Sequence, residues 1–284
     1  MNYLEIFATN NPTALSVCAI IIGTVIGSFL NVVIYRLPKM MEQAWENELN
    51  ALQGKPINNR TFNLLKPRSS CDTCNHTIRL YENIPLASYL LLKGKCRYCG
   101  HTIRPRYPII ELLSGLITGY FAWKFGWSFH TIATSIFALS LLTLTCIDLE
   151  THLLPDNITL PLIWIGLLFN LNKEFTSLES AVIGAALGYS ILWMVYWIFK
   201  LITNKEGMGY GDFKMLAAIG AWLGLEAVLP VIIISSLAAS FVGVTLILLR
   251  QQNRASAIPF GPYLALGAMI TLLNSSTIRQ WIGG

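Results

Sequence analysis

TALSVCAIIIGTVIGSFLNVVIY, residues 13–35, is an apolar run without a single charged side chain. A helix needs about 20 such residues to cross the hydrocarbon core of a bilayer. The preceding stretch, MNYLEIFATNNP, lacks the basic start of a signal peptide and carries Glu5. The run is also longer than the apolar segment of a signal peptide. It is therefore predicted to be a retained membrane helix.

The rest of the chain is also strongly apolar. Of its 284 residues 54% are hydrophobic and 12% are charged, and its mean hydropathy is +0.54, outside the range of soluble globular proteins. We therefore expect an all-α polytopic membrane protein with about eight transmembrane helices. The expected helices are 13–35, 108–125, 130–147, 157–171, 179–201, 213–225, 227–249 and 259–274. The fourth and the sixth are short for a full span.

Residues 36–106 interrupt this pattern, because they are polar and hold four of the six cysteines. The expected organisation is a first transmembrane helix (1–35), a small insert (36–106) and a transmembrane core (107–284). The insert carries 12 of the 20 Lys and Arg residues, so the positive-inside rule places it in the cytoplasm and the N-terminus outside. Because the net charge of +5 is an orientation signal, we expect no nucleic-acid binding.

Two cysteine knuckles repeat within the insert. CDTCNHTIRL at 71–80 and CRYCGHTIRP at 96–105 share C-x-x-C-x-H-T-I-R, and four thiolates satisfy a tetrahedral Zn²⁺. The sequence thus predicts a zinc-ribbon-like insert with a structural ion held by four ligands: Cys71, Cys74, Cys96 and Cys99. Alternatives are two disulfides, which a cytoplasmic location disfavours, or His76 and His101 as substitute ligands. Cys18 and Cys146 are expected to be packing residues.

Carboxylates beside membrane helices are costly and are therefore candidates for function. Asp148 follows the run IATSIFALSLLTLTCI, and Asp212 lies in GMGYGDFK, residues 207–214. The topology puts both at cytoplasmic helix ends. Two facing carboxylates are the minimum apparatus for aspartic peptide hydrolysis, because one activates a water while the other protonates the carbonyl.

Each carboxylate also has a structural interpretation. Asp212 could cap the helix that follows it, and Asp156 is expected to cap the helix after Pro155. Asp148 comes at the end of a helix, where the dipole disfavours a negative charge, so its position calls for another reason. The glycines of GMGYGD follow no strand and fail the dinucleotide-loop pattern. We expect Gly209 and Gly211 to leave room for an extended substrate strand.

With these motifs the chain resembles the type IV prepilin peptidases, which are intramembrane aspartic peptidases with a G-x-G-D motif. The matching segments, besides the two knuckles, are GSFLNVVIYRLP (27–38), ENIPLASYLLLKGKC (82–96), RYPIIELL (106–113), IDLETHLLPD (147–156), GMGYGDFKMLAAIGAWLG (207–224) and PFGPYLALG (259–267). The resemblance implies that Asp148 and Asp212 are the catalytic pair and that Asp156 is structural.

The resemblance also implies a substrate and a second activity. Members of this family, in the bacterial inner membrane, cleave the basic leader of prepilins and pseudopilins after a glycine on the cytoplasmic side. Many then methylate the new N-terminal residue with S-adenosylmethionine. Residues 36–106 contain no glycine-rich cofactor loop, so the sequence assigns no methyl-donor site. Glu111 is a candidate for holding the substrate amine, and an acidic residue reaching the interface is the alternative.

Two other classes of protein fit the sequence less well. A proton- or cation-coupled transporter would place its carboxylates near the midplane and show inverted repeats, and the sequence has neither feature. A zinc-stabilised membrane scaffold accounts for the cysteines but gives Asp148 and GMGYGD no role. The expected partners are prepilin or pseudopilin substrates and membrane lipid. The sequence indicates no oligomeric state.

Overall fold

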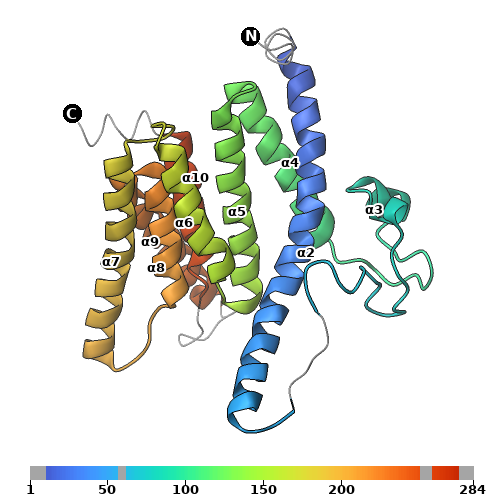
Figure 1. The fold of residues 1–284 in the computed structure, drawn as a ribbon, viewed down its shortest axis with the longest axis horizontal. Coiled ribbons are helices and arrows are strands. Elements are labelled where there is room, and N and C mark those ends of the chain that lie inside the picture. Colours follow the sequence, from blue (N-terminus) through green and yellow to red (C-terminus); the bar gives the residue numbers. More distant parts are fainter. Residues whose placement is uncertain (1–10, 57–61, 250–257, 275–284) are drawn as a thin grey trace. The chain divides into compact units, whose positions relative to one another are not determined.

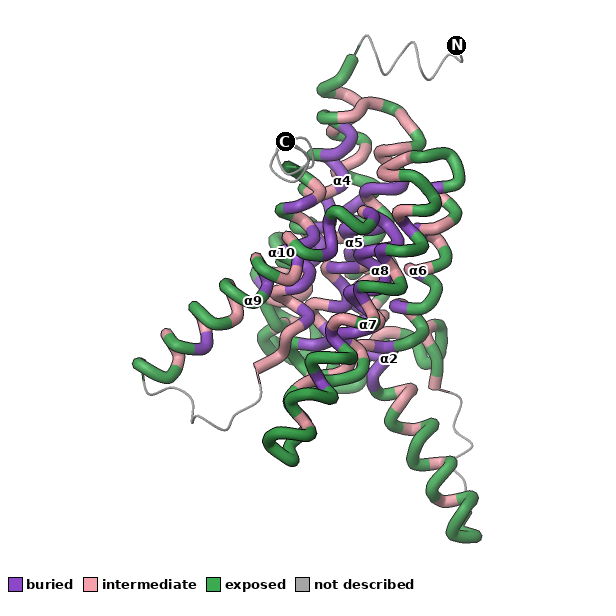
Figure 2. The backbone as a smooth tube through the Cα atoms, turned by 90° about the vertical axis from the view of Figure 1, so that its left-hand side faces the viewer, coloured by how far each residue is buried: buried purple, intermediate pink, exposed green. Residues whose placement is uncertain are grey.

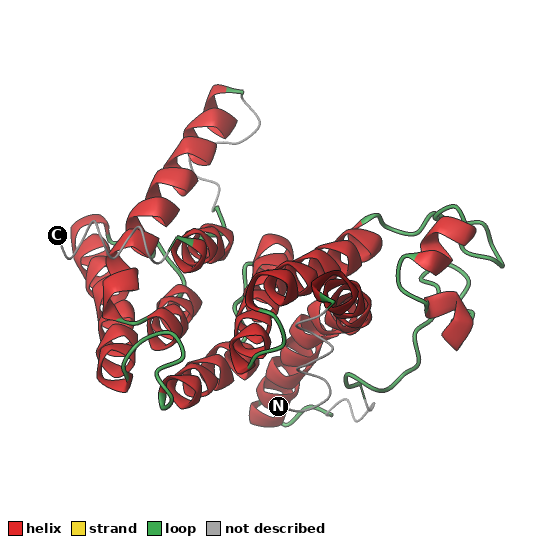
Figure 3. Cartoon of the chain, turned by 90° about the horizontal axis from the view of Figure 1, so that it is seen from above, coloured by secondary structure: helices red, strands yellow, loops and turns green. Residues whose placement is uncertain are grey.

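The computed structural model describes residues 11–56, 62–249 and 258–274. Within these ranges the chain forms helices and loops, with no extended sheet (Figure 3). Along the chain (Figure 1) the elements are α2 (Pro12–Leu52), η1 (Leu80–Asn83), α3 (Ala87–Leu91), α4 (Arg106–Phe125), α5 (Phe129–Thr151), α6 (Asp156–Asn170), α7 (Leu178–Thr203), α8 (Tyr210–Leu223), α9 (Leu225–Leu248) and α10 (Gly261–Leu273). Residues 1–10, most of the stretch that precedes the first predicted membrane helix, lie outside the described residues.

The all-helical membrane fold predicted from the sequence is confirmed. Four described helices are long and apolar enough to cross a bilayer, namely α2, α5, α7 and α9, and α10 is a shorter apolar helix. Along α9 the apolar side chains Leu229, Ile233, Leu237, Phe241 and Val244 are exposed at spacings of three or four residues. Such a continuous apolar stripe is suited to lipid. The count of about eight spans stays a prediction.

Helix α2 is longer than the expected span. It continues past Tyr35 and through Pro38 to Leu52. Residues 39–52 are rich in Met, Glu, Gln, Ala and Leu, which favour helix, and they contain no glycine. The helix ends just before Gly54, whose φ of +66° is incompatible with an α-helix. The beginning of the polar insert is therefore helical.

The chain divides into two compact units, Met1–Leu139 and Ser140–Gly284. In the N-terminal unit α2 packs closely against α4. A Cβ added to Gly27 would lie 2.8 Å from the Cα of Glu111, so only glycine allows this approach. One turn away from Gly27 the helices are also joined by a hydrogen bond, because Nδ2 of Asn31 donates to the carbonyl of Tyr107 at 3.0 Å.

In the C-terminal unit α8 is the central helix. It contacts α6, α7, α9 and α10, and buried residues run along its length (purple in Figure 2). Phe213, Met215, Leu216, Ile219 and Trp222 are fully buried. Since protein covers α8 on all sides, its fourteen residues need not match the thickness of a bilayer.

A buried asparagine fastens the end of α6 to the end of α8. Nδ2 of Asn170 donates to the carbonyls of Ala221 and Trp222 at 2.9 Å each. Its Oδ1 accepts from the backbone N–H groups of Phe175 and Thr176 at 3.0 and 3.1 Å. All four hydrogen-bonding positions of the amide are thus used.

We predict that Asn170→Leu destabilises the C-terminal unit by about 3 kcal/mol or more, because it leaves several buried backbone groups without partners. Thermal unfolding in detergent, followed by tryptophan fluorescence, measures the change. The control is Asn172→Leu, since Asn172 is exposed and only its backbone forms a hydrogen bond. Equal melting temperatures for the two variants would contradict the prediction.

Candidate functional site

Asp148 and Asp212 both lie in the C-terminal unit, at opposite ends of their helices. Asp148 is in the last turn of α5 and Asp212 in the first turn of α8. The expectation that Asp212 or Asp156 serves as an N-cap is wrong. The N-cap residues of α8 and α6 are Gly209 and Pro155, and the carboxylate of Asp212, three residues into α8, accepts a hydrogen bond from the backbone N–H of Gly209. Asp212 is still favoured by the positive end of the α8 dipole.

The two carboxylates form a buried pair. Asp148 is 5% exposed and Asp212 is 7% exposed. They lie close enough for the charge of Asp148 to act on Asp212. A buried ionisable pair of like charge is costly to form, which argues for a functional reason.

The beginning of α10 orients Asp148. The backbone N–H of Gly261 donates to Oδ2 of Asp148 at 2.9 Å. A Cβ added to Gly261 would lie 2.7 Å from the same oxygen, so the site requires glycine there. Sequence analysis assigned Gly261 no role, although PFGP directly before an apolar run marks a helix N-terminus with free N–H groups. Three helices, α5, α8 and α10, therefore contribute to the site.

The other acidic residue of this region has a different role. Nζ of Lys214 lies 2.7 Å from both carboxylate oxygens of Asp156, which ties the start of α6 to the first turns of α8. Asp156 is partly exposed, so this ion pair contributes little to stability. Asp156 thus forms an ion pair in place of the helix cap that the sequence predicted.

The two loop glycines differ in their surroundings. A Cβ at Gly211 would lie 2.6 Å from Cβ of Leu154, so close packing already requires a glycine. At Gly209 the nearest side-chain atom would be Oδ2 of Asp212, at 3.7 Å, which leaves open space beside the carboxylate. Gly209 is therefore the better candidate for the approach of a substrate strand.

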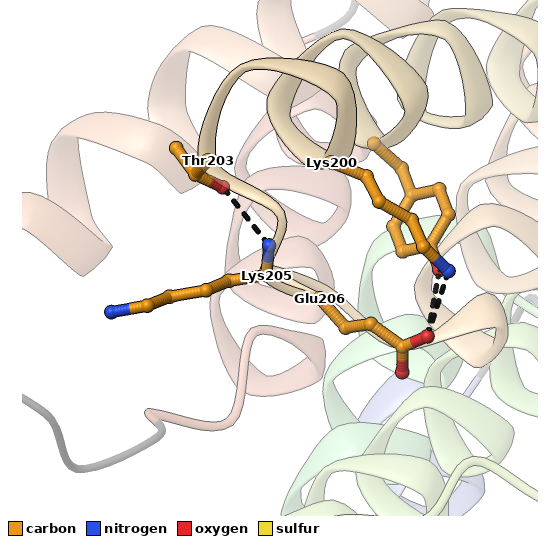
Figure 4. Close-up of polar contacts among 5 residues, drawn as sticks. Lys200, Thr203, Lys205 and Glu206 are labelled. Atoms are coloured by element: carbon orange, nitrogen blue, oxygen red, sulfur yellow. Dashed lines mark hydrogen bonds and ion pairs between the residues drawn. The ribbon is translucent and has the colours of Figure 1, made fainter.

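The connector between α7 and α8 is held by polar contacts (Figure 4). Nζ of Lys200 donates to Oε1 of Glu206 at 2.9 Å and to the hydroxyl of Tyr196 at 3.1 Å. The hydrogen bond from Lys200 lowers the pKa of Glu206. Oγ1 of Thr203 accepts from the backbone N–H of Lys205 at 3.3 Å. These contacts restrain the segment that leads into Gly209 and Asp212.

A cluster of four cysteines lies in the N-terminal unit. The sulfur atoms of Cys71, Cys74, Cys96 and Cys99 all lie within 4.8 Å of one another. They form one group that could hold a metal ion, and this group includes neither His76 nor His101. The His76 ring instead lies against the ring of Tyr98, with ring centroids 3.5 Å apart and the ring planes tilted by 34°.

The two knuckles have the same backbone structure, as their shared pattern predicts. The N–H of Cys71 donates to the carbonyl of His76 at 3.0 Å, and Cys96 donates to His101 at 2.8 Å. Each knuckle then turns through a left-handed residue, Asn75 with φ +55° or Gly100 with φ +71°. An isolated antiparallel bridge closes each turn: Ser70 with Thr77, and Lys95 with Thr102.

The chemistry of the cluster suits a cation. Hydrogen bonds from the backbone N–H groups of Cys74 and Thr73 lower the pKa of Cys71 to about 6. At Cys99 the backbone N–H of His101 lowers the pKa, but desolvation and the three neighbouring cysteines outweigh it and raise the pKa to about 12. Four adjacent thiols can all ionise only when a positive ion balances them.

Comparisons with known proteins identify the family of the chain. Residues 21–125 match the bacterial peptidase A24 N-terminal domain, and residues 135–244 match the type IV leader peptidase family. The chain is 51% identical to a prepilin leader peptidase/N-methyltransferase of Aeromonas hydrophila, covering 90% of this chain and 89% of that protein. Proteins of the same name are 47% identical in Pseudomonas aeruginosa, over 96% and 95%, and 46% identical in Stutzerimonas stutzeri, over 94% and 93%.

No solved structure matches the chain. Identity of this level over nearly the whole length is sufficient to show common descent and a common fold. The chain belongs to the prepilin leader peptidase/N-methyltransferase family.

Proposed function

We propose that this protein cleaves the leader peptide from type IV prepilins or pseudopilins, with Asp148 and Asp212 as its catalytic pair, and that it N-methylates the new N-terminal residue with S-adenosylmethionine, as the name of its relatives implies. The observation that carries the proposal is the burial of two interacting carboxylates, one of which is oriented by the N–H of Gly261. Neither a transporter nor a catalytically inactive scaffold accounts for such a pair together with the family relationship.

The arrangement supports hydrolysis of a peptide bond. When the pair shares one proton, the ionised carboxylate takes a proton from water, and the water oxygen attacks the scissile carbonyl. The protonated carboxyl donates to the carbonyl oxygen. The hydrogen bond from Gly261 limits how Asp148 can turn, and the space beside Gly209 allows an extended substrate backbone to reach Asp212.

We predict that Asp148→Asn and Asp212→Asn each lower leader cleavage about 1,000-fold, because an amide cannot exchange protons in this way. Cleavage of a co-purified prepilin is followed by mass spectrometry. Asp156→Asn is the matched control and should retain cleavage, since Asp156 forms an exposed ion pair. Full cleavage by either of the first two variants would remove that residue from the mechanism.

We further propose that the cysteine cluster binds a structural Zn²⁺. Zn–S bonds of about 2.3 Å in a tetrahedron place the sulfurs about 3.8 Å apart. The Sγ atoms of Cys71 and Cys99 lie 3.7 Å apart. Four thiolates leave no open position for a reactive water, so the ion would hold the knuckles together.

We predict that Cys71→Ser purifies with much less than one zinc per chain, while leader cleavage continues because Asp148 and Asp212 lie in the other unit. Elemental analysis of the purified protein gives the zinc content. Cys18→Ser is the control, since Cys18 is exposed on α2, where the sequence predicted a packing residue. A full zinc content in Cys71→Ser would contradict the ligand assignment.

For the localisation, we propose the bacterial inner membrane with the N-terminus in the periplasm and residues 36–106 and both aspartates on the cytoplasmic side. The division into a first helix (1–35), an insert (36–106) and a peptidase core (107–284) stays part of this proposal. The prepilin and the surrounding lipid are the expected partners, with no nucleic acid.

We predict opposite labelling of two introduced cysteines in a background without Cys18 and Cys146. In intact spheroplasts a membrane-impermeant maleimide should label Asn172→Cys, in a predicted periplasmic loop, and should spare Glu46→Cys in the insert. Lysis should expose the second site. Labelling in the reverse order would contradict the proposed orientation.

A further inference from the structure

The connector between α7 and α8, residues 204–209, ends in contact with the proposed catalytic pair. The backbone N–H of Gly209 donates to the carboxylate of Asp212, and Asp148 receives its own hydrogen bond from the backbone N–H of Gly261. Each carboxylate is thus held by one backbone N–H. A catalytic carboxylate works only within a narrow range of orientations. The position of Gly209 therefore bears directly on how Asp212 can act.

The backbone of the connector does little to fix that position. Asn204 ends α7 in the left-handed region, with φ +54°. Two glycines follow, Gly207 and Gly209, and a glycine backbone adopts many conformations. Within the described residues, Gly207 and Met208 make no backbone–backbone hydrogen bond. The connector therefore depends on side chains for its anchoring.

Glu206 provides the anchor, three residues before Gly209. Its Oε1 accepts from Nζ of Lys200 at 2.9 Å (Figure 4) and from the hydroxyl of Tyr196 at 3.3 Å. Nζ of Lys200 also donates to that hydroxyl, at 3.1 Å. The ion pair alone would hold the connector weakly, because the side chains of Lys200 and Glu206 are 37% and 71% exposed. The buried member of the group is Tyr196.

Tyr196 links the connector to the first turn of α8. It is 2% exposed, and its ring centroid lies 5.3 Å from that of Tyr210 and 5.7 Å from that of Phe213. The hydroxyl groups of Tyr196 and Tyr210 also interact. Tyr210 and Phe213 stand on either side of Asp212 in the sequence, and Phe213 is fully buried. One buried side chain of α7 thus contacts both the anchor of the connector and the turn that carries Asp212.

We propose that Tyr196 is a positioning residue for leader cleavage. Its hydroxyl holds Glu206, the anchor of the connector, and the connector in turn keeps the N–H of Gly209 on Asp212. The proposal rests on the proposed function. The described hydrogen bonds of Tyr196 reach neither aspartate, so it acts through the connector. Without its hydroxyl, Asp212 can turn away from the productive orientation, which slows the chemical step more than it weakens substrate binding.

The first test removes only the hydroxyl. In Tyr196→Phe the ring still packs against Phe213, and Lys200 and Glu206 can still pair, so the fold is retained. Full-length purified protein is incubated with increasing amounts of a prepilin, and mass spectrometry follows leader loss. We expect kcat to fall about tenfold and KM to change by less than about twofold.

Tyr189→Phe is the matched control for this variant. Its ring also packs on Phe213, with centroids 5.8 Å apart, and its hydroxyl makes no hydrogen bond within the described residues. It should therefore retain the kcat of the wild type.

A pair of charge changes separates positioning from a general structural role. Glu206→Lys places two like charges at the anchor and should also lower kcat about tenfold. Adding Lys200→Glu restores an ion pair with its ends exchanged, in which the Tyr196 hydroxyl can again donate and accept. The double variant should recover about half of the wild-type kcat or more, because the two changes compensate each other.

Hydrogen exchange followed by mass spectrometry tests the anchoring without relying on activity. In Tyr196→Phe the amides of residues 204–209 should exchange at least about fivefold faster than in the wild type, while those of α10 keep their rates. Wild-type kcat or wild-type exchange in this variant would overturn the proposal and leave the peptidase assignment unaffected.

A loss of cleavage that is matched by a lower melting temperature, and that the exchanged ion pair does not recover, would show a purely structural role and would also overturn the proposal. A wild-type protein that leaves the prepilin uncleaved would overturn the proposed function, and this role of Tyr196 with it.

Discussion

The structure of the C-terminal unit depends on keeping two carboxylates out of water within an apolar helical bundle. Burying one such group without a partner costs several kcal/mol, and a second like charge adds to the cost. Two features offset part of it: the backbone N–H of Gly261 for Asp148, and the positive end of the α8 dipole for Asp212. Both the Gly261 hydrogen bond and the position of Asp212 at the start of α8 depend on the packing of the surrounding helices. The buried apolar side chains of α8 and the fully bonded Asn170 provide that packing.

The N-terminal unit meets a different constraint. A polar insert of this length has few apolar side chains with which to build a core, so it relies on local closure. The two knuckles supply this closure through repeated backbone hydrogen bonds and left-handed residues at Asn75 and Gly100. Their position against α2 and α4 then creates a cavity with a buried carboxylate. The two units thus differ in how they are stabilised.

Much of this could be predicted from the sequence, because the strongest signals are local. Apart from α2, the long helices fall within a few residues of their expected ranges, and the C-x-x-C repeat indicated the cysteine cluster that the structure contains. The errors also have local causes. An N-cap was expected for Asp156 and was the structural alternative for Asp212 because aspartate is common there, but the N-cap residues are Pro155 and Gly209. The extension of α2 to Leu52 was missed because residues 39–52 are polar, although they favour helix.

The sequence could not predict contacts between residues that lie far apart in the chain. Nothing near Gly261 indicates that its N–H meets Asp148, 113 positions earlier, and nothing near Asn31 indicates that it faces the turn before Glu111. Such pairs arise only when helices pack at particular depths, which is a property of the whole bundle.

The extended part of α2 has a consequence for how the insert can vary. Nη1 of Arg36 donates to the carbonyls of Asn63 and Leu64 at 3.0 and 3.3 Å, so the chain leaves and returns at the same point. These two hydrogen bonds therefore join the ends of the excursion, which is the segment between Arg36 and Asn63. The entropy cost of closing such an excursion grows only slowly with its length. Evolution could therefore lengthen or shorten this excursion while the knuckles and the cavity stay unchanged.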